Sequence, residues 1–258
     1  MSDLIFEYKE TVAILTLNRA EAHNALSKAL AQEASEALRT AEANSQVRSI
    51  LIMGAGGKAF SAGTDLKERR FFDTAQKIEQ AKAGADLNRA VLECSKPVLA
   101  AIGGWCLGGG LELALHCDAR IAAEDSVFGF PEMSLGSFPG AGGPLALQRL
   151  LGSATARELL LFPARFGAAE ALRLGLISKS VSKDALRFEG IAFARRAGAA
   201  GPLALSALKE ILLLGEEGKA DDAQELARKL HGQLAATEDA AEGLAAHFEK
   251  RAPNFKGK

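Results

Sequence analysis

Two segments that contain glycine and glutamate have the clearest potential for chemistry. The first is Gly108-Gly109-Gly110-Leu111-Glu112, which lies between an apolar run typical of a buried strand, Val98–Ile102, and a run with helical character, Leu111–His116. Glycines at such a junction expose backbone N–H groups at the positive end of a helix dipole. In the second segment, Phe130-Pro131-Glu132-Met133, the proline marks the end of a strand. Backbone donors for a negatively charged oxygen, together with two carboxyl groups, suit acid–base chemistry beside a carbonyl.

The residues around Glu112 distinguish it from an ordinary surface glutamate. Taken singly, a glycine run indicates a flexible turn, and an isolated glutamate indicates a solvated side chain. Glu112 is flanked by Leu111, Leu113 and Leu115, a stretch too apolar for a surface helix. A carboxyl group buried there costs free energy unless it has a partner or a function. We therefore expect Glu112 to be functional.

Composition narrows the class of protein. The chain has 258 residues, 48% of them hydrophobic, which is enough for one large domain or a domain with an appendage. A formal net charge of −1 argues against nucleic acid or an anionic membrane as the main partner. No apolar run approaches the ~18 residues that span a bilayer, and the start resembles neither a secretion signal nor an import peptide. The three cysteines and four histidines show no metal-ligand spacing, so we expect no bound metal. The cysteines are expected to be reduced, partly buried thiols, as in a cytoplasmic protein.

Alternating strand and helix patterns predict an α/β fold. The expected strands are Ile5–Lys9, Val12–Leu17, Ser49–Met53, Val98–Ile102 and parts of Ile121–Phe130. Ser27 has the position of an N-cap for a helix reaching about Glu42, and a charged helix is expected over Asp73–Leu92. Beyond Pro139–Pro144 the chain is rich in helix formers. The helices predicted there are Ala154–Leu161, Ala168–Leu174, Lys183–Ala197, Pro202–Leu214, Ala220–Leu234 and Thr237–Lys250.

A third segment, Lys58–Lys67, combines Phe60, which can anchor in the core, with Ala62-Gly63, which allow close backbone approach. Lys58 and Lys67 flank this loop and could meet phosphates. By itself such a loop is most often only a connection. It lacks the P-loop pattern, and Gly108–Gly110 lacks the full dinucleotide-binding pattern.

Together these segments resemble the crotonase (enoyl-CoA hydratase/isomerase) superfamily over essentially the whole chain. The resemblance rests on Asn18–Leu26, Phe60–Lys67, Gly108–Ala114, Phe130–Gly143 and the C-terminal Phe248–Lys256. It implies an α/β crotonase spiral of short strand and helix units over residues 1–195. A C-terminal helical trimerisation region, residues 196–258, would follow. The resemblance also implies a homo-oligomer, either a trimer or a dimer of trimers.

The resemblance further implies an acyl-CoA thioester substrate, whose carbonyl oxygen would lie between the backbone N–H groups of Thr64 and Gly109. Having both Glu112 and Glu132 is typical of hydratases, which add water reversibly and in syn fashion to a trans-2-enoyl-CoA. Glu112 would act as base while the water oxygen attacks Cβ, and Glu132 would deliver a proton to Cα. CoA would be part of the substrate, with no separate cofactor. The remaining substrate-binding residues implied are Ala62, Asp65, Leu66, Gly140, Lys58, Lys67 and Lys250, the last reaching a neighbouring subunit's CoA.

Some alternatives stay open. An enoyl-CoA double-bond isomerase would need only Glu132, and another crotonase reaction on an acyl-CoA is a further alternative. A non-catalytic CoA- or RNA-binding member would need neither glutamate. Solvated surface positions explain Lys58 and Lys250 equally well. Phe130 and Pro144-Leu145-Ala146 depart from the family pattern and are expected to reshape the acyl pocket, which the helix over Phe71–Leu92 should wall. We expect the protein to act in fatty acid metabolism, and the sequence does not identify the acyl group of its substrate.

Overall fold

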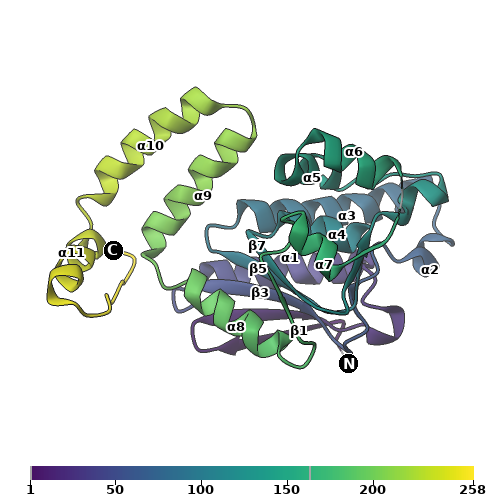
Figure 1. The fold of residues 1–258 in the computed structure, drawn as a ribbon, viewed down its shortest axis with the longest axis horizontal. Helices are drawn as coiled ribbons and strands as arrows, with labels where there is room; N and C mark the ends of the chain where they lie inside the picture. Colours follow the sequence, from purple (N-terminus) through teal and green to yellow (C-terminus); the bar gives the residue numbers. More distant parts are fainter. Residues whose placement is uncertain (1, 163) are drawn as a thin grey trace.

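Six strands form the larger sheet of the protein, whose computed structural model describes residues 2–162 and 164–258 (Figure 1). Their order is β1 (Leu4–Lys9), β2 (Val12–Leu17), β3 (Ser49–Gly54), β5 (Val98–Ile102), β7 (Ala119–Ala123) and β10 (Lys179–Val181). β1 runs antiparallel to β2, and the other neighbours are parallel. Every residue of β2 is buried, as expected for a strand of a parallel sheet that is covered on both faces.

Different helices cover the two faces of this sheet. Helices α1 (Lys28–Ala43), α3 (Thr74–Glu93) and α4 (Gly109–His116) lie on one side, and α8 (Leu186–Ala197) lies on the other (Figure 1). Strand β2 contributes to both cores, because successive side chains point to opposite faces. Leu15 and Leu17 belong to the larger core, which includes α1, while Val12 and Ile14 pack in the smaller core with residues of α8.

A smaller second sheet is built by repetition. After β3, β5 and β7 the chain leaves the larger sheet and adds a short strand to the smaller one. These are β4 (Ala59–Ser61), β6 (Trp105–Leu107) and β8 (Val127–Gly129), which are parallel; β9 (Phe166–Gly167) pairs antiparallel with β8. The carboxyl ends of β4, β6 and β8 therefore meet at one edge.

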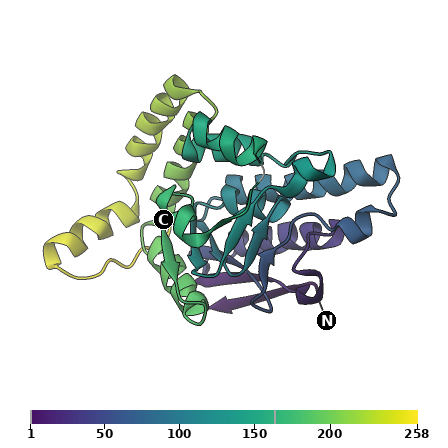
Figure 2. The ribbon, with the colours of Figure 1, turned by 45° about the vertical axis from the view of Figure 1, so that its right-hand side comes forward.

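The remaining helices follow the strands or form the C-terminal part. They are η1 (Ala20–Ala22), α2 (Leu66–Arg69), η2 (Pro131–Leu135), α5 (Gly143–Leu151), α6 (Ser153–Leu161), α7 (Ala168–Arg173), α9 (Pro202–Glu216), α10 (Ala220–Leu234) and α11 (Glu238–Glu249). Helices α9 and α10 pack side by side, and α11 lies beyond them, away from the sheets (Figures 1 and 2). No single helix among the described residues is long and apolar enough to cross a membrane, and α8 and α9, which reach that length and composition only together, are bent by 94°.

Most predicted elements are confirmed. Ser27 caps α1, with its Oγ accepting a hydrogen bond of 3.0 Å from the backbone N of Leu30. Helix α8 begins at Leu186, later than predicted, because Ala185 N closes a turn onto Ser182 O. Helix α5 was not predicted, although Pro144 fits its first turn, where a missing N–H costs nothing. The predicted boundary after residue 195 falls inside α8.

Arg120 secures the end of the helix that carries Glu112. Its side chain is buried and donates to the carbonyl oxygens of Ala114 (3.1 Å) and Cys117 (2.7 Å) at the end of α4. It also donates to Leu176 O at 2.7 Å, which ties α4 to the segment before β10. Burial lowers the pKa of Arg120 from its ordinary value, and the carbonyl oxygens supply the hydrogen-bond acceptors that a buried guanidinium group needs.

We expect Arg120→Met to lower the free energy of unfolding by at least ~3 kcal/mol, because several buried carbonyls would lose their donor. Urea unfolding followed by circular dichroism measures the loss. Arg173→Met is the matched control: Arg173 pairs with Glu170 at the surface, and such exposed pairs contribute less than ~1 kcal/mol. Equal losses in the two variants would contradict the assignment.

Candidate active site

The edge where β4, β6 and β8 end carries the three segments singled out in the sequence. Ala62–Thr64 follow β4, Gly108 and Gly109 follow β6, and Glu132 lies in η2 just after β8. Together with α2 and α3 they line a cavity of about 580 Å³. Ligands of parallel sheets commonly bind at the carboxyl ends of the strands, so this edge is the candidate active site.

Two backbone N–H groups lie side by side at this edge. A β-carbon on Gly63 would come 3.1 Å from Gly109 N, and one on Gly109 would come 3.5 Å from Thr64 N. Within residues 2–162 and 164–258, neither Thr64 N nor Gly109 N donates a hydrogen bond. Gly109 opens α4, so its N–H also points from the positive end of that helix. The arrangement suits binding of a negatively charged oxygen.

Glu112 is held by the loop that precedes α5. Its side chain lies on α4, and the residue is only 3% exposed. Its Oε1 accepts hydrogen bonds from the backbone N of Ala141 (2.8 Å) and of Gly143 (2.9 Å). A β-carbon on Gly143 would lie 2.5 Å from Glu112 Cγ, so only glycine allows this approach. From the other side, Asn88 Nδ2 on α3 donates to Ala141 O at 2.9 Å and thereby fixes the loop.

Glu132 has a different environment. Its Oε1 lies against Gly108, where a β-carbon would overlap it, and Gly108 has a positive φ of 50°. Its Oε2 is buried without a hydrogen-bond partner among the described residues. Glu132 therefore faces the cavity with one carboxyl oxygen that has no hydrogen-bond donor among the described residues.

These environments affect the pKa values of the two carboxyl groups differently. Burial, together with a smaller contribution from the charge of Glu112, raises the pKa of Glu132 to about 7, although the residue's own backbone N–H opposes the rise. Burial also raises the pKa of Glu112, but the hydrogen bonds from Gly143 and Ala141 oppose that rise. Glu132 is thus suited to donate a proton and Glu112 to accept one.

Comparison with known proteins agrees with this geometry. The profile of the enoyl-CoA hydratase/isomerase family matches residues 7–258. The chain is 37% identical to a crotonyl-CoA hydratase of Syntrophomonas wolfei, over 99% of this chain and 98% of that protein. It is 36% identical to a 2,3-dehydroadipyl-CoA hydratase of Escherichia coli, with complete coverage of both. The chain belongs to the enoyl-CoA hydratase/isomerase family.

The fold of the chain also matches that of a solved member of this family. A crystal structure of an enoyl-CoA hydratase from Bacillus anthracis superposes with a TM-score of 0.96 at 35% identity, covering all of both chains. The α/β crotonase fold predicted from the sequence is therefore confirmed, including its helical C-terminal region.

Most of the site residues predicted from the family resemblance line the cavity. They are Glu112, Glu132, Thr64, Gly109, Ala62, Leu66 and Gly140. Helix α3 forms a wall, as predicted. Phe130 does not line the cavity, because its ring is buried in the core, and Pro144-Leu145-Ala146 also lie outside the lining, so an effect of these residues on the pocket stays a prediction.

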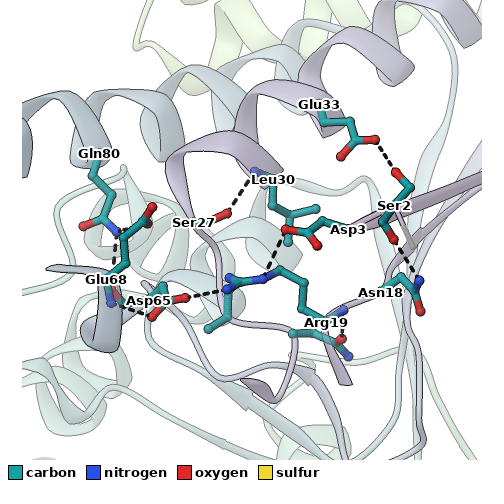
Figure 3. Close-up of polar contacts among 12 residues, drawn as sticks. Ser2, Asp3, Asn18, Arg19, Ser27, Leu30, Glu33, Asp65, Glu68 and Gln80 are labelled. Atoms are coloured by element: carbon teal, nitrogen blue, oxygen red, sulfur yellow. Dashed lines mark hydrogen bonds and ion pairs between the residues drawn. The ribbon is translucent and has the colours of Figure 1, made fainter. Parts of the chain in front are cut away.

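Four other predicted binding residues lie outside the cavity. Asp65 is buried: its Oδ2 pairs with Arg19 Nη2 at 2.8 Å, and its Oδ1 caps α2 (Figure 3). Lys58 and Lys67 are exposed beside the loop. Lys250 ends α11, in the part of the chain remote from both sheets (Figure 1). Within a single chain, therefore, Lys250 does not reach the site.

The raised pKa of Glu132 predicts a pH dependence of stability. Because the native carboxyl group holds its proton up to about pH 7, whereas its ordinary pKa is 4.5, the native state binds more protons across this interval. The free energy of unfolding should therefore fall as pH rises from about 4.5 to about 7. We expect Glu132→Gln to remove part of that decline, measured by urea unfolding at pH 5 and pH 7.5.

The control for this measurement is Glu225→Gln on the exposed side of α10. It should follow the pH dependence of the unaltered protein. If Glu132→Gln also follows it, Glu132 does not have a raised pKa.

Proposed function

We propose that this protein catalyses the reversible syn-hydration of a trans-2-enoyl-CoA, with Glu112 and Glu132 as the acid–base pair. Membership of the enoyl-CoA hydratase/isomerase family and the names of the relatives support the reaction class. The observation that carries the residue roles is the presence of two differently stabilised carboxyl groups beside two backbone N–H groups in one cavity.

In this mechanism the thioester oxygen accepts hydrogen bonds from Thr64 N and Gly109 N. Glu112 takes a proton from water while the water oxygen attacks Cβ, and protonated Glu132 gives its proton to Cα. The negative charge that develops on the thioester oxygen is stabilised by the two donors, each typically contributing ~3–4 kcal/mol. The Glu112 carboxylate keeps its orientation because Ala141 and Gly143 hold one of its oxygens.

The proposal includes the setting of the reaction. CoA belongs to the substrate, and no further cofactor takes part. Ala62, Leu66 and Gly140 line the cavity that would receive the thioester, while the exposed Lys58 and Lys67 are available to its phosphates. The three cysteines are free and buried, which suits a cytoplasmic enzyme of fatty acid or related acyl-CoA metabolism.

Isomerisation of the double bond is the second candidate, because Glu132 alone could move a proton between two carbons. Its pKa of about 7 favours it as a group that both gives and accepts a proton near neutral pH. The hydrogen-bonded Glu112 has no evident task in that reaction, which is why hydration is the preferred proposal.

Glu112→Gln and Glu132→Gln should each lower kcat for crotonyl-CoA hydration by roughly 10²–10⁴-fold, since each removes one proton-transfer group. Binding of acetoacetyl-CoA, measured by calorimetry, should change little because the oxyanion donors are main-chain groups. The double variant should lose far less than the product of the single losses, because the two groups act as a unit in one addition.

Full hydratase activity of Glu112→Gln would refute the two-carboxylate mechanism. Isomerisation of a 3-enoyl-CoA that survives Glu112→Gln but not Glu132→Gln would instead favour the isomerase.

We further propose that copies of the chain assemble through the C-terminal helices, as a trimer or a dimer of trimers. Leu244 and Phe248 on α11 are 63% and 76% exposed, and Leu208 and Leu212 on α9 are also exposed. Exposed apolar groups on these two C-terminal helices indicate an interface. In such an assembly, Lys250 would contact the CoA bound in a neighbouring copy.

Phe248→Glu should therefore reduce the oligomer to smaller species and weaken acyl-CoA binding, measured by light scattering after size exclusion and by calorimetry. Gln224→Glu adds the same charge at an exposed position of α10 and should leave the assembly intact. A Phe248→Glu protein that keeps both its mass and its affinity would exclude this interface.

A further inference from the structure

We infer that the end of the cavity formed by α2 and the first turns of α3 binds a carboxylate at the far end of the acyl group. The substrates would then be enoyl-CoA thioesters of dicarboxylic acids. The inference rests on the proposed function, and it adds the chemical class of the acyl group. It depends on Arg69, Lys77 and the helix face between Lys77 and the reaction centre.

Arg69 is held in a fixed orientation at the cavity wall. Its Nη1 donates to Lys77 O at 3.0 Å and to Gln80 Oε1 at 3.2 Å. Gln80 is only 4% exposed, and its Nε2 donates to Glu68 Oε2 at 3.1 Å (Figure 3). Only Nη1 is used in these contacts, and a guanidinium group has five N–H donors. A positioned guanidinium with donors to spare is suited to bind a carboxylate.

Lys77 adds a second positive charge at the same end of the cavity. Both Arg69 and Lys77 line it, and neither has a carboxylate within 4.0 Å among the residues the structure describes. Of the nearby acidic groups, Asp65 pairs with Arg19, while Glu68 is joined to Arg69 only through the neutral amide of Gln80 and does not line the cavity. The acidic residues that line the cavity are Glu112 and Glu132 at the reaction centre. Two cations that line the cavity without a direct ion pair among the described residues therefore favour an anionic ligand.

One face of α3 connects these cations to the reaction centre. Lys77, Ala81, Gly84 and Asn88 line the cavity at helical spacing, and Asn88 contacts the loop that holds Glu112. At 1.5 Å per residue, Lys77 lies ~16 Å along the helix from Asn88. Besides Gln80, the wall between them is formed by the small residues Ala81 and Gly84, and a β-carbon on Gly84 would meet nothing within 4 Å. An acyl chain can therefore extend along this face until its end reaches the cations.

The phosphates of CoA are the competing anions for this pair. Lys58 and Lys67, which are exposed and lie outside the cavity, are the better candidates for phosphates. The two possibilities differ experimentally, because every substrate carries the CoA phosphates and only dicarboxylic substrates carry the terminal carboxylate.

The test compares trans-2-enoyl-CoA substrates of graded length that end either in a carboxylate or in a methyl group. We expect the unaltered protein to prefer the carboxylate at one chain length. Arg69→Gln and Lys77→Gln should each lower the ratio of kcat/KM, carboxylate to methyl, by about 10- to 100-fold, as for the loss of a charged hydrogen bond. Lys82→Gln on the exposed side of α3 is the matched control and should retain the ratio.

Binding of the saturated thioesters, measured by calorimetry, should show the same preference and the same losses. This measurement tests the carboxylate site even if the protein fails to hydrate any enoyl-CoA, a result that would refute only the proposed function. Equal losses for carboxylate and methyl ligands, or no preference in the unaltered protein, would overturn the inference. Because Lys77 donates no side-chain hydrogen bond within the described residues, Lys77→Gln remains informative if Arg69→Gln destabilises α2.

Discussion

The burial of Glu112 is the constraint on which the rest of the site depends. A carboxyl group removed from water needs hydrogen-bond donors, and this one takes both from the main chain at Ala141 and Gly143. Those donors belong to a loop that Asn88 holds from α3, while Arg120 secures the other end of α4. The Glu112 carboxylate and its hydrogen bonds thus link α3, α4 and the loop before α5.

The repeated strand pairs explain why distant segments meet. Each time the chain leaves the larger sheet it adds one short strand to the smaller sheet, and the residues that follow β4, β6 and β8 are the ones that face the cavity. Glycine is required where these segments touch: Gly108 makes room for Glu132, and Gly143 makes room for Glu112. The chemistry therefore depends on short connections, while the two hydrophobic cores hold the strands that carry them.

Sequence reasoning identified the elements whose signals are local. The apolar runs of β2, β3 and β5 and the capping position of Ser27 mark these elements directly. The three-residue strands β4 and β6 are too short to produce a periodic pattern, and α5 follows a glycine-proline stretch that indicates a loop. Asn88 was missed because its partner, Ala141, lies far away in the sequence. The side chain of Asp65 binds Arg19, a contact that only the folded chain brings together.

The two halves of α3 differ in how firmly they are packed. Toward its C-terminal end, Leu87, Asn88 and Val91 are buried, whereas Ile78, near the start, is largely exposed. Substitutions in the exposed turns change stability little, while substitutions beside Asn88 disturb the core. The early turns of this one helix can therefore change in sequence while the later turns, which hold the loop beside Glu112, stay the same.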